Sequence, residues 1–321
     1  MYKISFISLA FFISLSFVSC KDEPPTSSIS ENFVEFYFYH KTDSCHNIYK
    51  HTKDGDIPII IDSKHQDWWP RISPDNTTLL WYKSPKNGDY NDYENAELWM
   101  SDPDGSNQRK VLELVDYNWK AQGVADWSPN SKELVMAATD SSGSWHIYTS
   151  DYDAKNIIKV STRKSLYADP SWSPDGTKIV FSAFPKDKIT VNLFDLEIHI
   201  MDKDGSNEVQ LTFDQMRDHD PYWSPDGKEI AFESQWTLID CFRGKWALRK
   251  YSFETDSVYD VVKDDEANGV PRWTSDSKEI YFGRSVCGEY GIIAKTHRDG
   301  GNLTTVLSNE NYAVFDCEII R

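Results

Sequence analysis

The chain has 321 residues, a net charge of −17, and tryptophan, tyrosine or phenylalanine at 14% of its positions. Such an acidic protein repels nucleic acid and anionic membrane surfaces, which we exclude as partners. Its charge is compatible with cations and basic proteins as partners. The high aromatic content, without a long amphipathic helical pattern, predicts an all-β fold.

Residues 1–19 have the pattern of an export signal. Lys3 precedes an apolar run from Ile4 to Val18, which is shorter than the ~20 residues of a membrane-spanning helix. The run leads into LSFVSC, which resembles a bacterial lipobox whose cysteine, Cys20, becomes lipidated. The alternative is an ordinary cleaved signal with an incidental cysteine. We expect a lipid-anchored protein of the bacterial cell envelope, at the outer membrane on the periplasmic side or the cell surface, with the anchor as its only membrane contact.

Residues 20–32 are expected to form a flexible tether after the lipidated cysteine. The stretch contains a Lys-Asp-Glu run, two prolines and several serines, a composition that cannot bury a core. The remaining residues, 33–321, are expected to form the folded domain.

An internal repeat is the main indication of the fold. Residues 169–181 read DPSWSPDGTKIVF and residues 220–232 read DPYWSPDGKEIAF, with weaker copies at 70–76, 125–134 and 271–280. The second turn residue of the copies falls at positions 74, 129, 174, 225 and 275, so successive copies are 55, 45, 51 and 50 residues apart. Four-stranded propeller blades have a similar period, about 40–50 residues.

Each copy of the repeat also contains residues that favour a tight turn between two strands. Ser-Pro-Asp-Gly suits a type I turn, because serine favours its first position, proline fixes φ at the second and glycine favours the fourth. The turn joins a short strand that ends in tryptophan to a second strand, such as residues 178–181. A third strand, an Asp-Gly hairpin turn and a fourth strand follow, for example over residues 197–212. Each repeat therefore predicts four antiparallel strands.

The Trp-Ser-Pro-Asp-Gly-Lys pattern resembles that of the TolB-like, WD-repeat-like β-propellers, and its copies cover nearly all of residues 33–321. The resemblance implies a six-bladed propeller. Residues 33–39, 47–50 and 57–61 are then strands of a blade that lacks its first strand, which residues 312–320 supply. Both chain ends would close the ring and remove exposed strand edges.

Strand order places the tight turns of every blade on one face, the turn face, and the long connections on the other, the long-loop face. The long connections are residues 84–96, 139–144, 183–196, 234–246 and 283–290. Binding residues on a rigid scaffold are concentrated in such loops, so function is expected at the long-loop face.

The innermost strands begin at the long-loop face, beside the central channel. The candidate channel-mouth binding residues there are Asp67, Asp126, Asp169, Asp218, His219, Asp220, Arg272 and Asp316. A ring of carboxylates could hold a hard cation such as Ca²⁺, the one cofactor that the pattern suggests. The alternative is that Asp169 and Asp220 hydrogen-bond neighbouring blade backbones and that His219 is an exposed loop residue, neither base nor ligand.

The aromatic residues form two groups. Four tryptophans have a fixed place in the repeat, which predicts a role in the core between blades: Trp127, Trp172, Trp223 and Trp273. Others lie in or beside the long loops and are candidates for contact with a protein or a glycan, or they pack their own loop: Tyr90, Tyr93, Trp236, Phe242 and Trp246.

Four cysteines follow Cys20, and an even number permits two disulfides in an exported protein. None lies in a Cys-x-x-Cys pair, so a zinc site is not expected. Cys45 and Cys317 both belong to the predicted closing blade, and Cys241 and Cys287 lie in equivalent loops of neighbouring blades. These two pairings are the hypothesised bridges.

The chain shows neither a Gly-x-Ser-x-Gly nor a His-Glu-x-x-His motif, and the repeats leave no room for a hydrolase domain. We therefore expect a non-catalytic, monomeric envelope lipoprotein that binds a protein or peptide through its long-loop face. The alternative is a carbohydrate-active propeller, either a glycan binder or a polysaccharide lyase, because some lyases use TolB-like propellers. Arg217, His219 and Arg272 would then be the nearest candidates for a catalytic base.

Overall fold

The computed structural model is built almost entirely of β-sheet over the residues that it describes, which are 33–42, 45–86, 92–187, 192–237, 244–285, 291–308 and 316–320. Residues 34–321 form one unit. The predicted signal, Cys20 and the tether lie outside the described residues. Among the described residues, no helix has the length and apolar character needed to cross a membrane.

Three sheets each contain four consecutive antiparallel strands. The first comprises β4 (His65–Ile72), β5 (Leu79–Pro85), β6 (Glu97–Ser101) and β7 (Arg109–Leu112). The second comprises β8 (Gln122–Trp127), β9 (Glu133–Thr139), β10 (Trp145–Asp151) and β11 (Ile158–Lys159). The third comprises β12 (Tyr167–Trp172), β13 (Lys178–Ala183), β14 (Glu197–Asp202) and β15 (Val209–Gln210). Two short 3-10 helices, Leu114–Tyr117 and Leu193–Asp195, lie in the connections.

Two further four-stranded units share one larger sheet. The first comprises β16 (Arg217–Trp223), β17 (Glu229–Thr237), β18 (Lys245–Ser252) and β19 (Ser257–Val262). The second comprises β20 (Ala267–Trp273), β21 (Glu279–Ser285), β22 (Gly291–His297) and β23 (Thr304–Leu307). A single parallel pair, Trp246 with Ala267, joins β18 to β20. The four-stranded antiparallel pattern predicted for each repeat is therefore confirmed.

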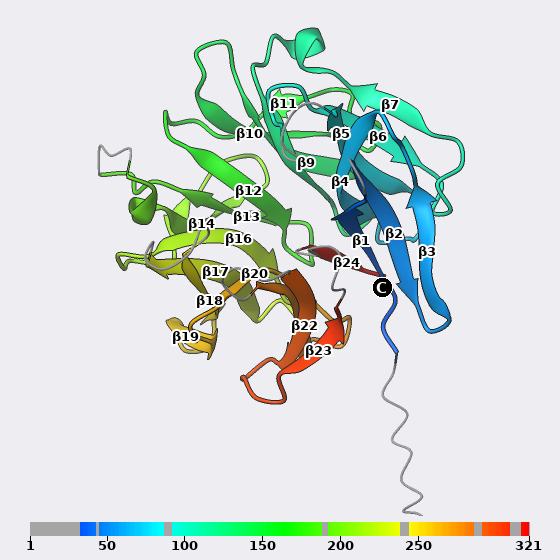
Figure 1. The fold of residues 1–321 in the computed structure, drawn as a ribbon. Coiled ribbons are helices and arrows are strands. Elements are labelled where there is room, and N and C mark those ends of the chain that lie inside the picture. Colours follow the sequence, from blue (N-terminus) through cyan, green and yellow to red (C-terminus); the bar gives the residue numbers. More distant parts are fainter. Residues whose placement is uncertain are drawn as a thin grey trace, which may run out of the picture. The chain divides into compact units, whose positions relative to one another are not determined.

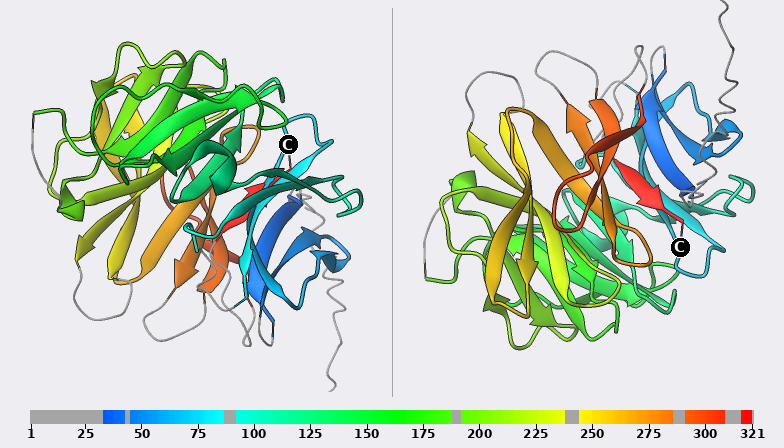
Figure 2. Two further views of the ribbon diagram at one scale, coloured as in Figure 1. Left: turned by 90° about the horizontal axis from the view of Figure 1, so that it is seen from above. Right: turned by 90° about the horizontal axis from the view of Figure 1, so that it is seen from below.

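The two chain ends meet in one sheet. Its order is β24 (Cys317–Ile319), β1 (Phe36–Lys41), β2 (His46–Thr52) and β3 (Gly55–Ile60). Phe36 pairs with Ile319, and Phe38 pairs with Cys317, as the predicted pairing of the C-terminal strand requires. The first strands contact one another in the order β4, β8, β12, β16, β20, β24 and β4 again, and the sheets radiate from them (Figures 1 and 2).

The repeat motif forms the predicted tight turn. The N–H of Gly176 donates to the carbonyl of Ser173 at 2.9 Å, and the N–H of Lys178 donates to the Ser173 hydroxyl at 2.9 Å. The repeat tryptophans lie between units, as predicted. Trp127 Nε1 donates across units to the carbonyl of Arg71 at 3.2 Å, and Trp273 Nε1 donates to that of Tyr222 at 3.2 Å.

A bulge in the first strand of each of the five repeats was not predicted from the sequence. The residue five positions before each turn proline, or its serine equivalent, has a positive φ of 47° to 54°: Trp69, Val124, Asp169, Asp220 and Val270. The register between the first and second strands shifts at each of these positions. Because a bulge re-aims the neighbouring side chains, it determines which of them lie inside the sheet and which face the axis.

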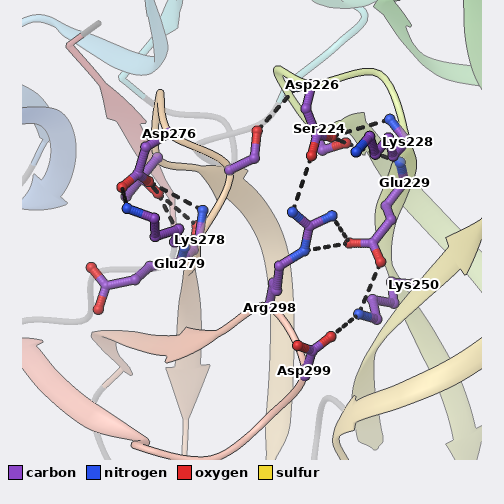
Figure 3. Close-up of polar contacts among 12 residues, drawn as sticks. Ser224, Asp226, Lys228, Glu229, Lys250, Asp276, Lys278, Glu279, Arg298 and Asp299 are labelled. Atoms are coloured by element: carbon purple, nitrogen blue, oxygen red, sulfur yellow. Dashed lines mark hydrogen bonds and ion pairs between the residues drawn. The ribbon is translucent and has the colours of Figure 1, made fainter.

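Ionic contacts join neighbouring units at the turn face (Figure 3). Arg298 lies 3.0 Å from Asp226 and 2.8 Å from Glu229, measured between guanidinium nitrogen and carboxylate oxygen. Lys250 bridges Glu229 at 3.0 Å and Asp299 at 2.7 Å. These contacts fasten one unit to the next at the turn face.

The predicted Cys45–Cys317 bridge is wrong in this structure, in which both thiols are buried and not bonded to each other. Cys317 pairs with Phe38, whereas Cys45 lies beyond the last β1–β2 pair, Lys41 with His46. At about 3.3 Å per residue along a strand, this offset exceeds the ~7 Å Cα separation that a disulfide tolerates. Cys241 and Cys287, the other hypothesised pair, lie outside the described residues.

Candidate functional site

Two of the predicted channel-mouth residues belong to a buried ionic cluster around the axis. Arg71 lies 3.0 Å from Asp316 and 3.9 Å from Glu318, and Arg272 lies 3.7 Å from Asp316 and 3.1 Å from Glu318. None of the four side chains is more than 7% exposed. The cluster balances two cations against two carboxylates and ties β24 to β4 and β20, so Arg272 and Asp316 are occupied within the fold.

Asp67 and Asp126 also serve the fold. Asp67 is fully buried, and it accepts a hydrogen bond from Trp81 Nε1 at 2.8 Å. Asp126 accepts from the Ser171 hydroxyl at 2.8 Å and from the N–H of Trp172 at 3.3 Å, both in the next unit. A role in fastening blades, which the sequence suggested for other aspartates, is therefore found at Asp126.

The structure brings together Asp169, His219 and Asp220, whose ligand atoms lie within 4.8 Å of one another. His219 Nδ1 lies 3.0 Å from Asp169 and 3.5 Å from Asp220, and its Nε2 lies 3.4 Å from Arg217. Asp169 and Asp220 are both bulge residues, so the backbone distortion is what turns these carboxylates toward the imidazole. His219 is partly buried and lies in strand β16, so it is not an exposed loop residue.

Glu233 is a member of this cluster that the sequence did not indicate. It pairs directly with His219 across β16 and β17, and its carboxylate accepts from the N–H of Val270 at 2.9 Å. A Cβ at Gly269 would lie 1.8 Å from Glu233 Oε2, so the glycine makes room for this carboxyl group. Burial, followed by the charge of Asp220, raises the pKa of Glu233.

The electrostatics of the cluster decide its chemistry. Burial lowers the pKa of His219, but Asp169 and Asp220 outweigh it and raise the pKa to about 10. His219 is therefore an imidazolium at neutral pH, which can donate hydrogen bonds but cannot accept a proton. The two aspartates already face a cation, and Ca²⁺ between them would have to displace it.

The eighth channel-mouth candidate, Asp218, turns away from the His219 cluster. Its carboxylate groups with those of Glu197 and Asp214, again within 4.8 Å of one another. Neither Glu197 nor Asp214 was singled out from the sequence, because Glu197 begins a strand, Asp214 lies in a connection between two units, and only the fold brings them together.

The predicted loop aromatics have mixed roles. The Tyr93 ring packs edge-on against Trp68 and Trp145 at centroid distances of 5.6 and 5.9 Å. The Trp236 ring faces the Lys245 and Lys263 ammonium groups at 5.4 and 5.7 Å. Trp246 faces the Arg217 guanidinium at 5.5 Å, at the edge of the His219 cluster. Tyr90 and Phe242 lie outside the described residues.

A pocket of about 470 Å³ opens beside Tyr93 on the long-loop face. Three connections line it: Asp92, Tyr93 and Glu94 follow β5, Lys120 and Ala121 precede β8, and Thr139, Gly143 and Trp145 surround the β9–β10 turn. Its charged groups are two carboxylates and the ammonium group of Lys120, beside two aromatic rings, so the lining has one carboxylate in excess, which attracts a cationic side chain. The sequence indicated Tyr93, but not its partners.

Comparison with known proteins gives one family. Residues 86–313 match the family model described as TolB beta propeller domain. A curated "Protein TolB homolog" from Chlorobium chlorochromatii is 24% identical over 135 residues, which cover 31% of this chain and 31% of the relative. The match thus spans about a third of that relative's length.

Two solved structures illustrate the range of proteins with a similar fold. TolB from Acinetobacter baumannii has a TM-score of 0.70 at 14% identity, covering 89% of this chain and 66% of the other. Oligogalacturonate lyase from Vibrio parahaemolyticus has a TM-score of 0.57 at 12% identity, covering 85% and 74%. At these identities the likeness concerns the fold alone.

Proposed function

The chain belongs to the TolB β-propeller family, and from this premise we propose that it is a non-catalytic binding protein of the bacterial envelope. Its long-loop face takes a protein or peptide partner, and the pocket beside Tyr93 receives a basic side chain of that partner. The observation that carries the proposal is this pocket, in which Asp92 and Glu94 stand beside the rings of Tyr93 and Trp145.

The construction of the pocket on the long-loop face supports this assignment. The turn face carries ion pairs between units, such as Arg298 with Asp226 (Figure 3), and a second pocket of about 580 Å³ that is lined by the tight repeat turns at Pro174 and Pro225. On the long-loop face, the pocket is lined by connections from two different sheets, as is usual where loops on a rigid scaffold bind a partner. The net charge of −17 favours association with a basic partner.

Site-specific photocross-linking in intact cells tests the proposal. A photoreactive residue at the exposed Asn95, which adjoins the pocket but does not line it, is expected to give one discrete cross-linked product. The matched control is Lys203, whose side chain is 53% exposed in a turn on the opposite face. Glu94→Lys should weaken capture by the same cross-linker at Asn95. Equal products from both faces, or capture that ignores the charge reversal, would refute the assignment.

We further propose that Cys20 carries the lipid anchor that keeps this face at the envelope. The supporting observation is the LSFVSC sequence at residues 15–20. Labelling with a fatty-acid probe should mark the wild type but not Cys20→Ser, and the variant should leave the membrane fraction. Labelling that persists in Cys20→Ser would exclude an anchor at this residue.

A second candidate, polysaccharide lyase activity, is favoured by one contact, the 3.4 Å approach of Arg217 to His219 Nε2. The raised pKa of His219, caused by Asp169 and Asp220 against the effect of burial, disfavours it as a base. Incubation with acidic polysaccharides decides between the two functions. Unsaturated products that disappear in His219→Ala would establish the lyase and displace the binding proposal.

A further inference from the structure

The group of Glu197, Asp214 and Asp218 lies apart from both the Tyr93 pocket and the His219 cluster. Glu197 begins β14, Asp218 lies in β16, and Asp214 belongs to the connection between β15 and β16. The N–H of Asp218 donates to the carbonyl of Leu196 at 3.0 Å, which holds the two strands' starting points together. Three carboxylates from two consecutive units therefore face one small volume.

One carboxylate oxygen in this group has no partner. Asp218 is fully buried, and its Oδ1 accepts from the Ser234 hydroxyl at 2.5 Å. Its other oxygen, Oδ2, makes no hydrogen bond to any described part of the chain. Glu197 is 3% exposed and accepts from the Thr212 hydroxyl at 2.6 Å. A buried carboxylate oxygen without a donor is costly, so it calls for a ligand or a proton.

The charges of the group are not balanced within the fold. The nearest cation, Arg249, lies 2.7 Å from Asp214 and 3.8 Å from Asp218. The same guanidinium lies 3.1 Å from a fourth carboxylate, Asp260, so it is shared. A second cation would relieve this excess of buried negative charge.

We propose that Glu197, Asp214 and Asp218 bind one hard divalent cation, such as Ca²⁺, Mg²⁺ or Mn²⁺. The groups that could ligate the ion are the three carboxylates and the hydroxyls of Thr212 and Ser234, and such oxygen ligands favour these ions over zinc or copper. The Asp214 side chain is 34% exposed, which provides a route from solvent. The His219 cluster differs, because an imidazolium already neutralises its aspartates.

A cation at this site would link the start of β14 to the connection that precedes β16. Glu197 directly follows the long connection after β13, and Asp214 lies in the connection that links two successive units. The ion would thus order the long-loop face between these units. This effect is independent of the partner proposed above, so either idea can fail without the other.

Binding of CaCl₂ and MnCl₂ to the chelator-treated, purified chain tests the inference by calorimetry and thermal unfolding. We expect one ion per chain and an unfolding temperature that rises with ion concentration. Glu197→Gln and Asp218→Asn should each weaken binding at least about tenfold. Both replace a carboxyl group by a neutral amide of the same shape, so the variants should fold.

Two variants with an equal charge change separate this site from other carboxylates. Asp265→Asn removes a carboxylate whose side chain is 84% exposed, and Asp169→Asn removes one from the His219 cluster. Both should retain the wild-type affinity. Absence of binding to the wild type, binding that survives in Asp218→Asn, or loss of binding in Asp169→Asn alone would overturn the proposal.

Discussion

Neutralising Asp316 should strongly destabilise the fold. In Asp316→Asn, the buried guanidiniums of Arg71 and Arg272 share one remaining ion-pair partner among the described residues, Glu318, which leaves a surplus of buried positive charge. Breaking a buried ion pair on one side costs about 3–5 kcal/mol of unfolding free energy. That cost is a large part of the 5–15 kcal/mol typical of a folded domain. Asparagine has nearly the same shape as aspartate, so a cavity does not contribute.

The turn face provides a matched control at the same distance. Arg298 and Asp226 lie 3.0 Å apart, as Arg71 and Asp316 do, but their side chains are 22% and 29% exposed rather than 4% and 1%. Asp226→Asn should therefore cost no more than about 1 kcal/mol, because solvent screens the pair. The comparison isolates burial from geometry.

Urea unfolding followed by tryptophan fluorescence measures both changes. The double variant Asp316→Asn, Arg71→Met removes the surplus cation. Its decrease in unfolding free energy should therefore be about 1–3 kcal/mol smaller than the sum of the decreases in the two single variants. Additive losses, or an Asp316→Asn cost as small as that of Asp226→Asn, would show that this cluster does not fasten β24.

Two further predictions concern pH and backbone conformation. Burial lowers the pKa of His199 to about 3, below its unfolded value of 6.5, so stability falls as pH drops from 6.5 toward 3; between pH 7 and pH 5 this residue should cost about 2 kcal/mol. Urea unfolding at pH 7 and pH 5 should show a smaller change in unfolding free energy for His199→Phe than for the wild type. An equal change in both proteins would mean that His199 is protonated in the folded state at pH 5. Gly205 and Gly143 have similar φ values, +88° and +82°, but a Cβ at Gly205 would lie 1.9 Å from the Val160 carbonyl, whereas one at Gly143 meets nothing within 4 Å. Gly205→Ala should therefore cost at least about 1 kcal/mol more than Gly143→Ala in urea unfolding, and equal losses would exclude the clash as the cause.

The sequence predicted the strands well because each repeat carries its own turn chemistry. Ser173 and Gly176 form the turn hydrogen bond that their residue types favour. The C-terminal strand was also predicted, because a blade without a first strand leaves an unpaired edge. The bulges could not be predicted, since Asp169 and Val270 share the same positive φ but no side-chain property that signals it.

The candidate sites were predicted less well, because they depend on strand register. His219 was an obvious candidate, but Glu233 faces it only through cross-strand pairing and has no local signal. Asp218 and Asp220 are two residues apart in the sequence, yet the bulge between β16 and β17 sends them to different carboxylate groups. The wrong Cys45–Cys317 pairing has a similar origin, because two residues in the same blade can lie at different positions along their strands.

The contact between β1 and β24 has a consequence for the order of folding. Phe36 and Ile319 are neighbours in space but lie almost a full chain length apart in the sequence. A polypeptide that emerges from a ribosome or a translocon N-terminus first must keep the edge of β1 open until its last residues arrive. Such long-range closure is slow, and a waiting edge invites mispairing with other chains. Loss of a few C-terminal residues would leave the edge of β1 permanently unpaired in every molecule of the protein.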